Sequence, residues 1–236
     1  MRTLVVVPTY NEAENLPWIC EQVLRLTGAD ILVVDDNSPD GTGGIAHGLA
    51  AADRRVNLLR RPGKAGLGTA YLAGFGWGLD RGYDFVVEMD ADGSHQPHQL
   101  PALIDAAQRS GAGLVIGSRW ARGGSVIGFA PHRLLLSRFG NWYARIMLGL
   151  GIHDLTGGFR VYSAAALRSI DLGSVRSQGY CFQVDLARRV AAIPAAVVEV
   201  PIAFAPRRHG ESKMSGRIVL EALVQVTRWG VSRRLR

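Results

Sequence analysis

Residues 84–98 read DFVVEMDADGSHQPH, and this stretch decides the fold class because an apolar strand ends in it abruptly at acidic side chains. In an extended chain alternate side chains share a face, so Glu88, Asp90 and Asp92 are expected to point the same way. Like charges this close are costly unless a cation such as Mg²⁺ lies among them. A solvated acidic loop behind a core strand is the alternative, and the stretch alone favours neither interpretation.

Outward from this strand, strand-like and helix-like segments alternate through the first half of the chain. Near-continuous apolarity in the strand-like runs is typical of a parallel sheet covered on both faces. The alternation predicts an α/β fold, a Rossmann-like, mostly parallel open sheet with right-handed crossovers and helices on both faces. The strand-like runs lie at 3–7, 31–34, 56–59, 84–89 and 113–117, and the helix-like stretches lie near 12–27, 42–53, 66–81 and 98–110.

The second half is less regular but has no linker or repeat, so one domain is expected over 1–236. A glycine-rich loop near 122–131 precedes a helical stretch at 132–150. Another helix is expected at 178–192, one or two short strands at 196–205, and a last helix at about 215–232.

Polar clusters follow three of the predicted strands, at 8–12 (PTYNE), 35–38 (DDNS) and 90–92 (DAD). Ligands of open α/β sheets bind outside the carboxyl ends of the strands. We expect Tyr10 to stack on a base, Glu12 to accept hydrogen bonds from a base or ribose, and Asp36 to contact a nucleotide. For residues 38–42 a structural turn before a helix is the better interpretation. Three clusters at one edge favour a ligand site over a chance acidic loop.

Composition narrows the class of protein. The chain has 236 residues, of which 47% are hydrophobic and 20% charged, which is enough for a full core and argues against disorder. Cys20 and Cys181 lie far apart and predict a reducing, cytoplasmic setting. No run approaches the roughly 18 to 20 apolar residues of a spanning helix, and no signal-peptide pattern opens the sequence. A soluble or peripheral protein is expected.

The net charge of +7 is unevenly distributed. Residues 106–153 contain six arginines and no acidic residue, and residues 207–236 contain eight Lys or Arg against two Glu. This asymmetry indicates anionic partners at two places, with nucleic acid, phosphate substrates and an anionic membrane as candidates. The basic residues are not interleaved with an aromatic platform for single strands, and DAD repels phosphates without metal, so nucleic acid is disfavoured.

The motifs, taken in order, resemble the family 2 glycosyltransferases, and more closely the dolichol-phosphate (polyprenol-phosphate) mannosyltransferases. They are PTYNE at 8–12, VVDDNSPDGT at 33–42, GKAGLGTAY at 63–71, MDADGSHQP at 89–97, GSR at 117–119, DLTGGFRVY at 154–162, GYCFQVDL at 179–186 and RRHGESKM at 207–214. The resemblance implies a GT-A fold with C-terminal interfacial helices. It also implies a nucleotide-binding half at 1–118 and an acceptor-binding, membrane-facing part at 119–236.

The resemblance further implies GDP-mannose as donor, a divalent cation (Mg²⁺ or Mn²⁺), and a set of site residues. A Ser stands at position 94 where some members have a Gln ligand, so it is expected to act through water. In relatives the helix of the GYCFQ segment commonly carries Glu where this chain has Asp185, which argues against a direct catalytic role. The implied metal residues are Asp90, Asp92 and Ser94, and the implied catalytic residues are Asp92, Arg119 and Arg207. The implied acceptor-phosphate residues are Arg119, Arg133 and Ser137. The implied nucleotide-sugar-binding residues are Pro8, Tyr10, Glu12, Val34, Asp36, Asp90, Ala91, Asp92, Arg119, Arg207 and Lys213.

The expected reaction is an inverting transfer of mannose to a polyprenyl phosphate. A phosphate monoester has its second pKa near ~6 and is largely ionised at neutral pH, so it needs no general base. Fixed arginines suit the task of holding it. Transfer of glucose or another hexose from a UDP-sugar to a lipid phosphate is the nearest alternative, and a catalytically silent subunit of a membrane complex is a further one, disfavoured by the intact DAD and RRHGESK motifs.

A lipid substrate requires the enzyme to reach a membrane surface, which we expect at its cytosolic face. The helix at 132–150 and the last helix, with Arg233, Arg234 and Arg236 at its end, are the expected interfacial elements. An ordinary core stripe and an exposed charged tail are the alternatives for these two segments. A separate membrane-spanning partner is left open.

Overall fold

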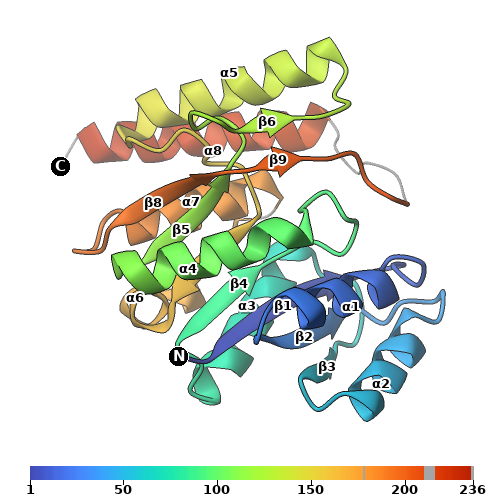
Figure 1. The fold of residues 1–236 in the computed structure, drawn as a ribbon. Coiled ribbons are helices and arrows are strands. Elements are labelled where there is room, and N and C mark those ends of the chain that lie inside the picture. Colours follow the sequence, from blue (N-terminus) through green and yellow to red (C-terminus); the bar gives the residue numbers. More distant parts are fainter. Residues whose placement is uncertain (178, 210–215, 235–236) are drawn as a thin grey trace.

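The computed structural model describes residues 1–177, 179–209 and 216–234, and its first half has the predicted alternation of strands and helices (Figure 1). Each predicted segment is present within a few residues of its expected bounds. The elements are β1 (Thr3–Thr9), α1 (Leu16–Leu26), β2 (Asp30–Asp35), α2 (Thr42–Ala52), β3 (Val56–Arg60), α3 (Leu67–Asp80), β4 (Phe85–Glu88), the short 3₁₀ helix η1 (Pro97–Gln99), α4 (Leu100–Ser110) and β5 (Leu114–Ser118).

The second half contains the expected helices and, in the described part of the chain, four elements that were not predicted: β6, β7, α6 and η2. β7 begins inside the segment that was noted only as a motif, 154–162, and α6 follows it. The elements are β6 (Ser125–Val126), α5 (Pro131–Leu148), β7 (Arg160–Ser163), α6 (Ala164–Ser169), the 3₁₀ helix η2 (Leu172–Ser174), α7 (Tyr180–Val190), β8 (Val197–Pro201), β9 (Ala203–Phe204) and α8 (Gly216–Arg234).

The main sheet has seven strands in the order β3-β2-β1-β4-β7-β5-β8. β1 pairs in parallel with β2 and β4, and β5 pairs in parallel with β8. β7 is inserted antiparallel between β4 and β5. The expected mostly parallel open sheet is therefore confirmed. The carboxyl ends of β1, β2 and β4 meet at one edge, as the position of the three polar clusters requires.

Apolar side chains of the strands alternate between two cores, one on each face of the sheet. Leu4 and Val6 of β1 belong to the core shared with α3 and α7, whereas Val5 and Val7 belong to the core shared with α1 and α4. These four side chains are fully buried, and each such burial contributes roughly 1.5–3 kcal/mol. Figure 1 shows the helices on both faces. The strands therefore hold the polar edge on a rigid base.

Helix α3 lies unusually close to β1 because its inward residues are glycines. A Cβ at Gly74 would lie 2.4 Å from a methyl group of Val6, and one at Gly78 would lie 2.9 Å from Leu4. Gly68, at the start of the same helix, has the Phe182 ring where a Cβ would go, at 2.8 Å. The glycines of this helix entry were expected to be close-packing residues, and Gly68 has that role.

Helices α5 and α8 lie side by side at one end of the molecule, beyond β6 and β9 (Figure 1). The Tyr143 hydroxyl of α5 is 2.6 Å from Oγ1 of Thr227 of α8. A Cβ at Gly230 would meet the Met147 carbonyl oxygen at 2.7 Å, which shows how closely the two helices pack. In the described ranges, no helix combines the length and the apolarity that crossing a bilayer requires.

Candidate active site

The carboxyl ends of β1, β2 and β4 surround a pocket of about 210 Å³, which we call the donor pocket. Eight of the eleven predicted nucleotide-sugar residues line it. Of the other three, Val34 is fully buried in the core beneath it, Arg119 lies outside its lining, and Lys213 is outside the described residues. The lining residues are Pro8, Thr9, Tyr10, Glu12, Asp36, Lys64, Gly66, Leu67, Ala70, Asp90, Ala91, Asp92 and Arg207.

Two carboxylates, Asp90 and Asp92, project from the turn that follows β4. Oδ1 of Asp90 accepts a hydrogen bond from the Tyr71 hydroxyl at 2.9 Å, and Oδ1 of Asp92 accepts one from the Ser94 amide at 2.9 Å. Burial raises the pKa of Asp90, and the nearby Asp92 raises it further. Bringing a cation between the two groups would relieve this repulsion.

The donor set fits a hard divalent cation that takes its remaining ligands from elsewhere. Within residues 1–177, 179–209 and 216–234, no cluster of three or more His, Cys, Asp or Glu side chains could hold a metal. Mg²⁺ and Mn²⁺ sites of nucleotide enzymes typically use one or two carboxylates, water and substrate phosphate oxygens. Asp90 and Asp92 match that pattern, so this pair is suited to a metal that arrives with a diphosphate.

Glu88 was expected to share a face with Asp90 and Asp92, but it does not line the donor pocket. Strand β4 ends at Glu88, so the two-residue alternation does not continue into the turn. The Glu88 side chain is 0% exposed and lies in register with Arg160 of β7. Burial raises the pKa of Glu88 to about 8, although Arg160 opposes the shift. This carboxyl group therefore belongs to the core beneath the site.

Ser94 and His95 fix the turn that carries the carboxylates. Ser94 is buried, and its carbonyl oxygen accepts a hydrogen bond from the Ala205 amide at 3.2 Å. Nδ1 of His95 accepts the Asp90 amide at 3.0 Å, and its ring stacks on Phe159 with 5.0 Å between centroids. Burial lowers the pKa of His95, which keeps the acceptor nitrogen unprotonated. This positioning role of His95 was not predicted, because no local pattern marks it.

The segment 205–209 runs along the same turn and brings Arg207 to the carboxylates. Nη1 of Arg207 is 3.1 Å from Oδ2 of Asp92, and the Arg207 side chain is 34% exposed. The Arg208 amide donates to the Asp92 carbonyl at 2.9 Å, and the Arg208 guanidinium lies 4.1 Å from the centre of the Trp18 ring. Two catalytic candidates, Asp92 and Arg207, are thus in direct contact.

At the opposite end of the donor pocket, Asp36 and Tyr10 have basic partners that sequence reasoning missed. Nη1 of Arg61 lies 2.7 Å from Oδ1 of Asp36, in a half-buried ion pair. The Lys64 ammonium lies 4.3 Å from the centre of the Tyr10 ring. The RRPGK stretch at 60–64 carries both partners, and its position at the end of the third strand is the signal that could have identified them.

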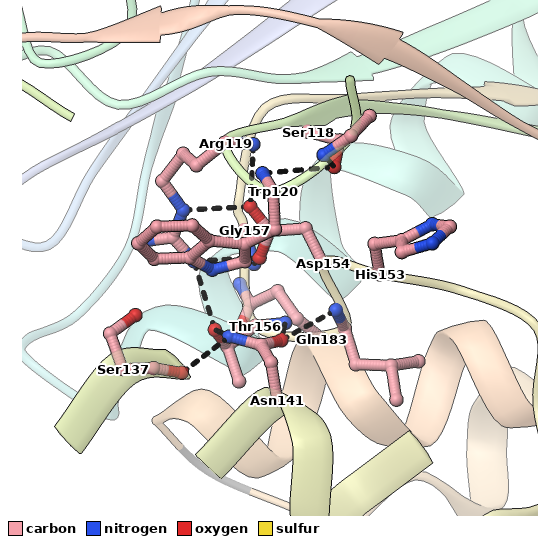
Figure 2. A network of polar contacts seen from close by, with 12 residues as sticks. Ser118, Arg119, Trp120, Ser137, Asn141, His153, Asp154, Thr156, Gly157 and Gln183 are labelled. Carbon is pink, nitrogen blue, oxygen red and sulfur yellow. Dashed lines mark hydrogen bonds and ion pairs between the residues drawn. The ribbon is translucent and has the colours of Figure 1, made fainter. Parts of the chain in front are cut away.

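Arg119 lies in a buried network with Asp154 and Thr156 (Figure 2). Its Nε and Nη2 donate to the two carboxylate oxygens of Asp154, both at 2.7 Å, and Nη2 also donates to Thr156 Oγ1 at 2.9 Å. Burial opposes ionisation of Asp154, yet the Arg119 guanidinium keeps the pKa of this carboxyl below its usual value. Asp154 was quoted only as part of a motif, and its role as the partner of Arg119 was missed.

The same network reaches the second acceptor-phosphate candidate, Ser137. Nδ2 of Asn141 donates to Thr156 Oγ1 at 3.0 Å and to the Ser137 carbonyl at 2.9 Å. Oδ1 of Asn141 accepts the Leu155 amide at 2.8 Å. Asn141 therefore ties α5 to the 154–157 loop (Figure 2) and holds Ser137 near Arg119.

An aromatic row connects the third acceptor-phosphate candidate, Arg133, to the same region. The Arg133 guanidinium lies 4.2 Å from the centre of the Phe129 ring. Phe129 packs edge-on against Phe204 at 5.7 Å, and the Arg119 guanidinium lies 5.4 Å from the Phe204 centroid. The structure thus links Arg133 to Arg119 through two aromatic rings, and Arg119 to the Ser137 carbonyl through Thr156 and Asn141.

The carboxylate of Asp185 is held by hydrogen bonds from neighbouring side chains. Its Oδ1 accepts hydrogen bonds from Arg188 at 2.7 Å and from Arg189 at 2.9 Å, and its Oδ2 accepts one from the Ser177 hydroxyl at 3.0 Å. The side chain is buried and makes these contacts from the middle of α7. They support the argument that Asp185 has no direct catalytic role.

The sequence matches the model of glycosyl transferase family 2 over residues 4–171. The chain therefore belongs to this family. It is 54% identical to the polyprenol monophosphomannose synthase of Mycolicibacterium smegmatis, over 99% of this chain and 89% of that protein. It is also 54% identical to the undecaprenyl-phosphate mannosyltransferase of Micrococcus luteus, over 99% of this chain and 96% of that one. The expectation of a hexosyltransferase is confirmed by the family and by these two relatives.

Solved structures share the fold. Glucosyl-3-phosphoglycerate synthase of Mycobacterium tuberculosis, solved with Mn²⁺, UDP-glucose and phosphoglyceric acid, matches with a TM-score of 0.67 at 19% identity, over 96% of this chain and 79% of that chain. A mannosyltransferase of Pyrobaculum calidifontis, solved with GDP-Man and Mn²⁺, matches with a TM-score of 0.62 at 16% identity, over 100% of this chain and 64% of that chain. These matches confirm the expected GT-A-like architecture.

Proposed function

We propose that the protein transfers mannose from GDP-mannose to a polyprenyl phosphate, with inversion at the sugar carbon, giving polyprenyl-phosphate mannose and GDP. The observation that carries this proposal is the meeting of two sites of opposite charge. The DAD carboxylates and Arg207 line the donor pocket. The network of Arg119 and Ser137 is linked to the DAD turn through Phe204, whose ring contacts both the Arg119 guanidinium and the His95 ring. The two relatives at 54% identity, each named for mannose transfer or synthesis on a polyprenyl phosphate, support the choice of sugar and acceptor.

On the donor side, Asp90 and Asp92 would hold Mg²⁺ or Mn²⁺ together with the diphosphate of the nucleotide. When bound, the cation supplies charge neutralisation for the leaving diphosphate. Arg207 lies 3.1 Å from Asp92 and has a partly exposed guanidinium, so it can turn to a phosphate oxygen when the donor enters. Tyr10 offers its ring to the base, and Glu12 offers acceptor oxygens to the base or ribose.

On the acceptor side, the nucleophile is a phosphate oxygen that is already ionised at neutral pH. It attacks C1 of mannose as the bond from C1 to the diphosphate oxygen breaks, so one displacement inverts the anomeric centre and no proton has to be removed. Arg119 is held rigidly by Asp154 and lies beside Ser137, while Arg133 approaches across Phe129. Such preorganised cations hold the acceptor without reorganisation at the moment of reaction.

The lipid acceptor requires a membrane surface, and we place this contact on α5 and α8 at the cytosolic face. Apolar side chains that would otherwise be buried are exposed on both helices, which is the pattern of an interfacial helix. They are Leu135, Leu136, Phe139, Trp142 and Ile146 on α5, and Leu220, Val224 and Val231 on α8.

A donor panel tests this function. Purified protein with a short-chain polyprenyl phosphate and Mn²⁺ is supplied in turn with GDP-mannose, GDP-glucose, UDP-glucose and UDP-galactose, and lipid-linked sugar is measured together with its anomeric configuration. Transfer from GDP-mannose alone, with inversion, is expected. Preference for a UDP-sugar would replace the donor assignment, and retention of configuration would overturn the single displacement.

A further inference from the structure

A second pocket of about 340 Å³ lies on the flank of α5, away from the donor pocket. We call it the arginine pocket. It shares no lining residue with the donor pocket, and Arg119 is the single member of its lining that the proposed reaction uses. Its lining residues are Arg119, Trp120, Ala121, Gly124, Arg138, Asn141, Trp142, Arg145 and His153.

Helix α5 contacts the protein interior, helix α8 and the arginine pocket with three different faces. Successive residues rotate by about 100° around a helix, so Ser137, Asn141 and Leu148 share the inner face. Tyr143 and Met147 lie on the flank that packs on α8. Arg138 and Arg145, two turns or about 10.5 Å apart, lie on the opposite flank. The arginine pocket is therefore open to solvent on the side of α5 that α8 does not cover.

In the part of the chain that the structure describes, the two arginines of this flank have no acidic partner. Among the described residues, Arg138 and Arg145 form no ion pair, and no carboxylate lines the pocket. The Arg138 guanidinium lies 5.1 Å from the centre of the Trp120 ring, which fixes its plane without neutralising it. Two unneutralised guanidinium groups on the rim of one hollow favour binding of an anion that accepts several hydrogen bonds.

The nearby carboxylates are already occupied. Asp154 is held by Arg119, and Glu199 accepts hydrogen bonds from both the amide and the ring of His153, at 2.8 and 2.7 Å. His153 itself is exposed at the pocket. Asp154 and Glu199 are therefore engaged by two other members of the pocket lining, Arg119 and His153, rather than by Arg138 or Arg145.

The arginine pocket borders the exposed apolar face of α5. Leu135 is 70% exposed and Trp142 is 57% exposed, and Phe139 and Ile146 are exposed beside them. Trp142 belongs to both the apolar face and the pocket lining. If this face enters a bilayer, the pocket lies at the depth of lipid phosphates, where amphipathic aromatic and arginine side chains are stable.

We propose that the arginine pocket binds the phosphate of an anionic glycerophospholipid, as a site separate from that of the acceptor phosphate. The proposal rests on the membrane location in the proposed function. Arg138 and Arg145 hold the phosphodiester, Trp142 packs on the lipid near its ester groups, and α5 is thereby fixed at one depth and orientation above the acceptor network.

Vesicle binding of two double variants tests this site. Arg138→Lys with Arg145→Lys keeps the net charge but removes the planar, multidentate donors. Binding to phosphatidylglycerol vesicles, measured by co-sedimentation, is expected to weaken roughly tenfold, and binding of GDP-mannose by calorimetry is expected to be unchanged. The control pair, Arg25→Gln with Arg54→Gln, removes two exposed charges at the α1 and α2 end and is expected to bind the vesicles within about twofold of the native chain.

Two results would overturn the site. If the Lys pair binds vesicles as tightly as the native chain while Arg138→Gln with Arg145→Gln binds weakly, the arginines attract the membrane only as diffuse charge. If the Lys pair keeps vesicle binding but loses turnover of a water-soluble short-chain prenyl phosphate without lipid, the acceptor phosphate occupies the pocket. Failure of the proposed function is distinct, since then the native chain binds vesicles but transfers no mannose.

Discussion

The donor pocket and the acceptor network differ in how the chain builds them. The donor pocket is assembled from turns at the ends of neighbouring parallel strands. Its carboxylates lie there because a parallel sheet brings the carboxyl ends of its strands to one edge. The acceptor network joins β5, α5 and the 154–157 loop through one buried ion pair and one buried amide. Changes in the donor pocket should therefore affect catalysis with little loss of stability, whereas changes in the acceptor network should affect both.

The largest effect on activity is expected from Asp92→Asn. The carboxamide keeps the volume and can still accept the Ser94 amide, but it removes the charge that faces Arg207 and the cation. Turnover should fall by at least roughly a thousandfold, because cation binding is worth several kcal/mol in the transition state. The urea midpoint should hardly move. Normal turnover in this variant would contradict the metal assignment. A large loss of stability would contradict the expectation that changes in the donor pocket affect catalysis with little loss of stability.

The largest effect on stability is expected from Asp154→Asn. Removing one member of a buried ion pair leaves the other charge uncompensated, at a cost of roughly 3–5 kcal/mol. Because the Asp154 pKa is lowered in the folded state, the stability it contributes is complete above its ordinary value of 3.8 and is lost as pH falls through the lower folded-state value. In urea unfolding, the difference in the free energy of unfolding between the native chain and the variant should thus be smaller at pH 3 than at pH 7. Asn141→Ala is the companion variant, expected to lower stability without this pH dependence.

Arg133→Ala should weaken binding of the acceptor without changing binding of the donor. The guanidinium packs on the Phe129 ring at a partly exposed position, so its loss should cost little stability. The KM for the polyprenyl phosphate should rise by roughly tenfold or more, as expected for loss of one charge-assisted contact. Calorimetric affinity for GDP-mannose should be unchanged. Loss of GDP-mannose affinity with normal acceptor saturation would instead move Arg133 to the donor side.

Much of the sheet and of the donor pocket was predictable, because both follow from short-range patterns. Strand-length apolar runs fixed the elements, and the parallel order placed residues 8–12, 36 and 90–92 at one edge. Glu88 was misplaced because β4 ends there, and alternation cannot be extended across a strand end that the pattern does not mark. The insertion of β7 was missed because its pairing with β4 depends on tertiary contacts, which the four residues of β7 do not reveal.

The acceptor side was predictable only as a list of residues. The resemblance supplied Arg119, Arg133 and Ser137, but not what holds them. Arg119 is separated by 35 residues from Asp154, and nothing local in either segment indicates the pairing. The acid-free stretch 106–153 indicated an anionic partner, yet only the helix geometry divides its arginines between the acceptor network and the opposite flank of α5.

The smallest effect is expected at the end of α8, where the structure gives Arg233 a different task from the predicted lipid contact. Its Nη1 donates to the Leu148 carbonyl at the carboxyl end of α5, where a helix has unsatisfied acceptors and favours positive charge. Arg236 and the side chain of Arg234 lie outside what the structure describes. Arg233→Gln should lower stability by about 0.5–1 kcal/mol, measured by urea unfolding, and change binding to anionic vesicles by less than about twofold. Deleting residues 235–236 is the matched variant, which removes one positive charge and leaves Arg233 in place. If Arg233→Gln instead weakened vesicle binding strongly while the unfolding midpoint stayed constant, Arg233 would belong to the membrane contact after all, and its bond to Leu148 would yield when the lipid surface is reached.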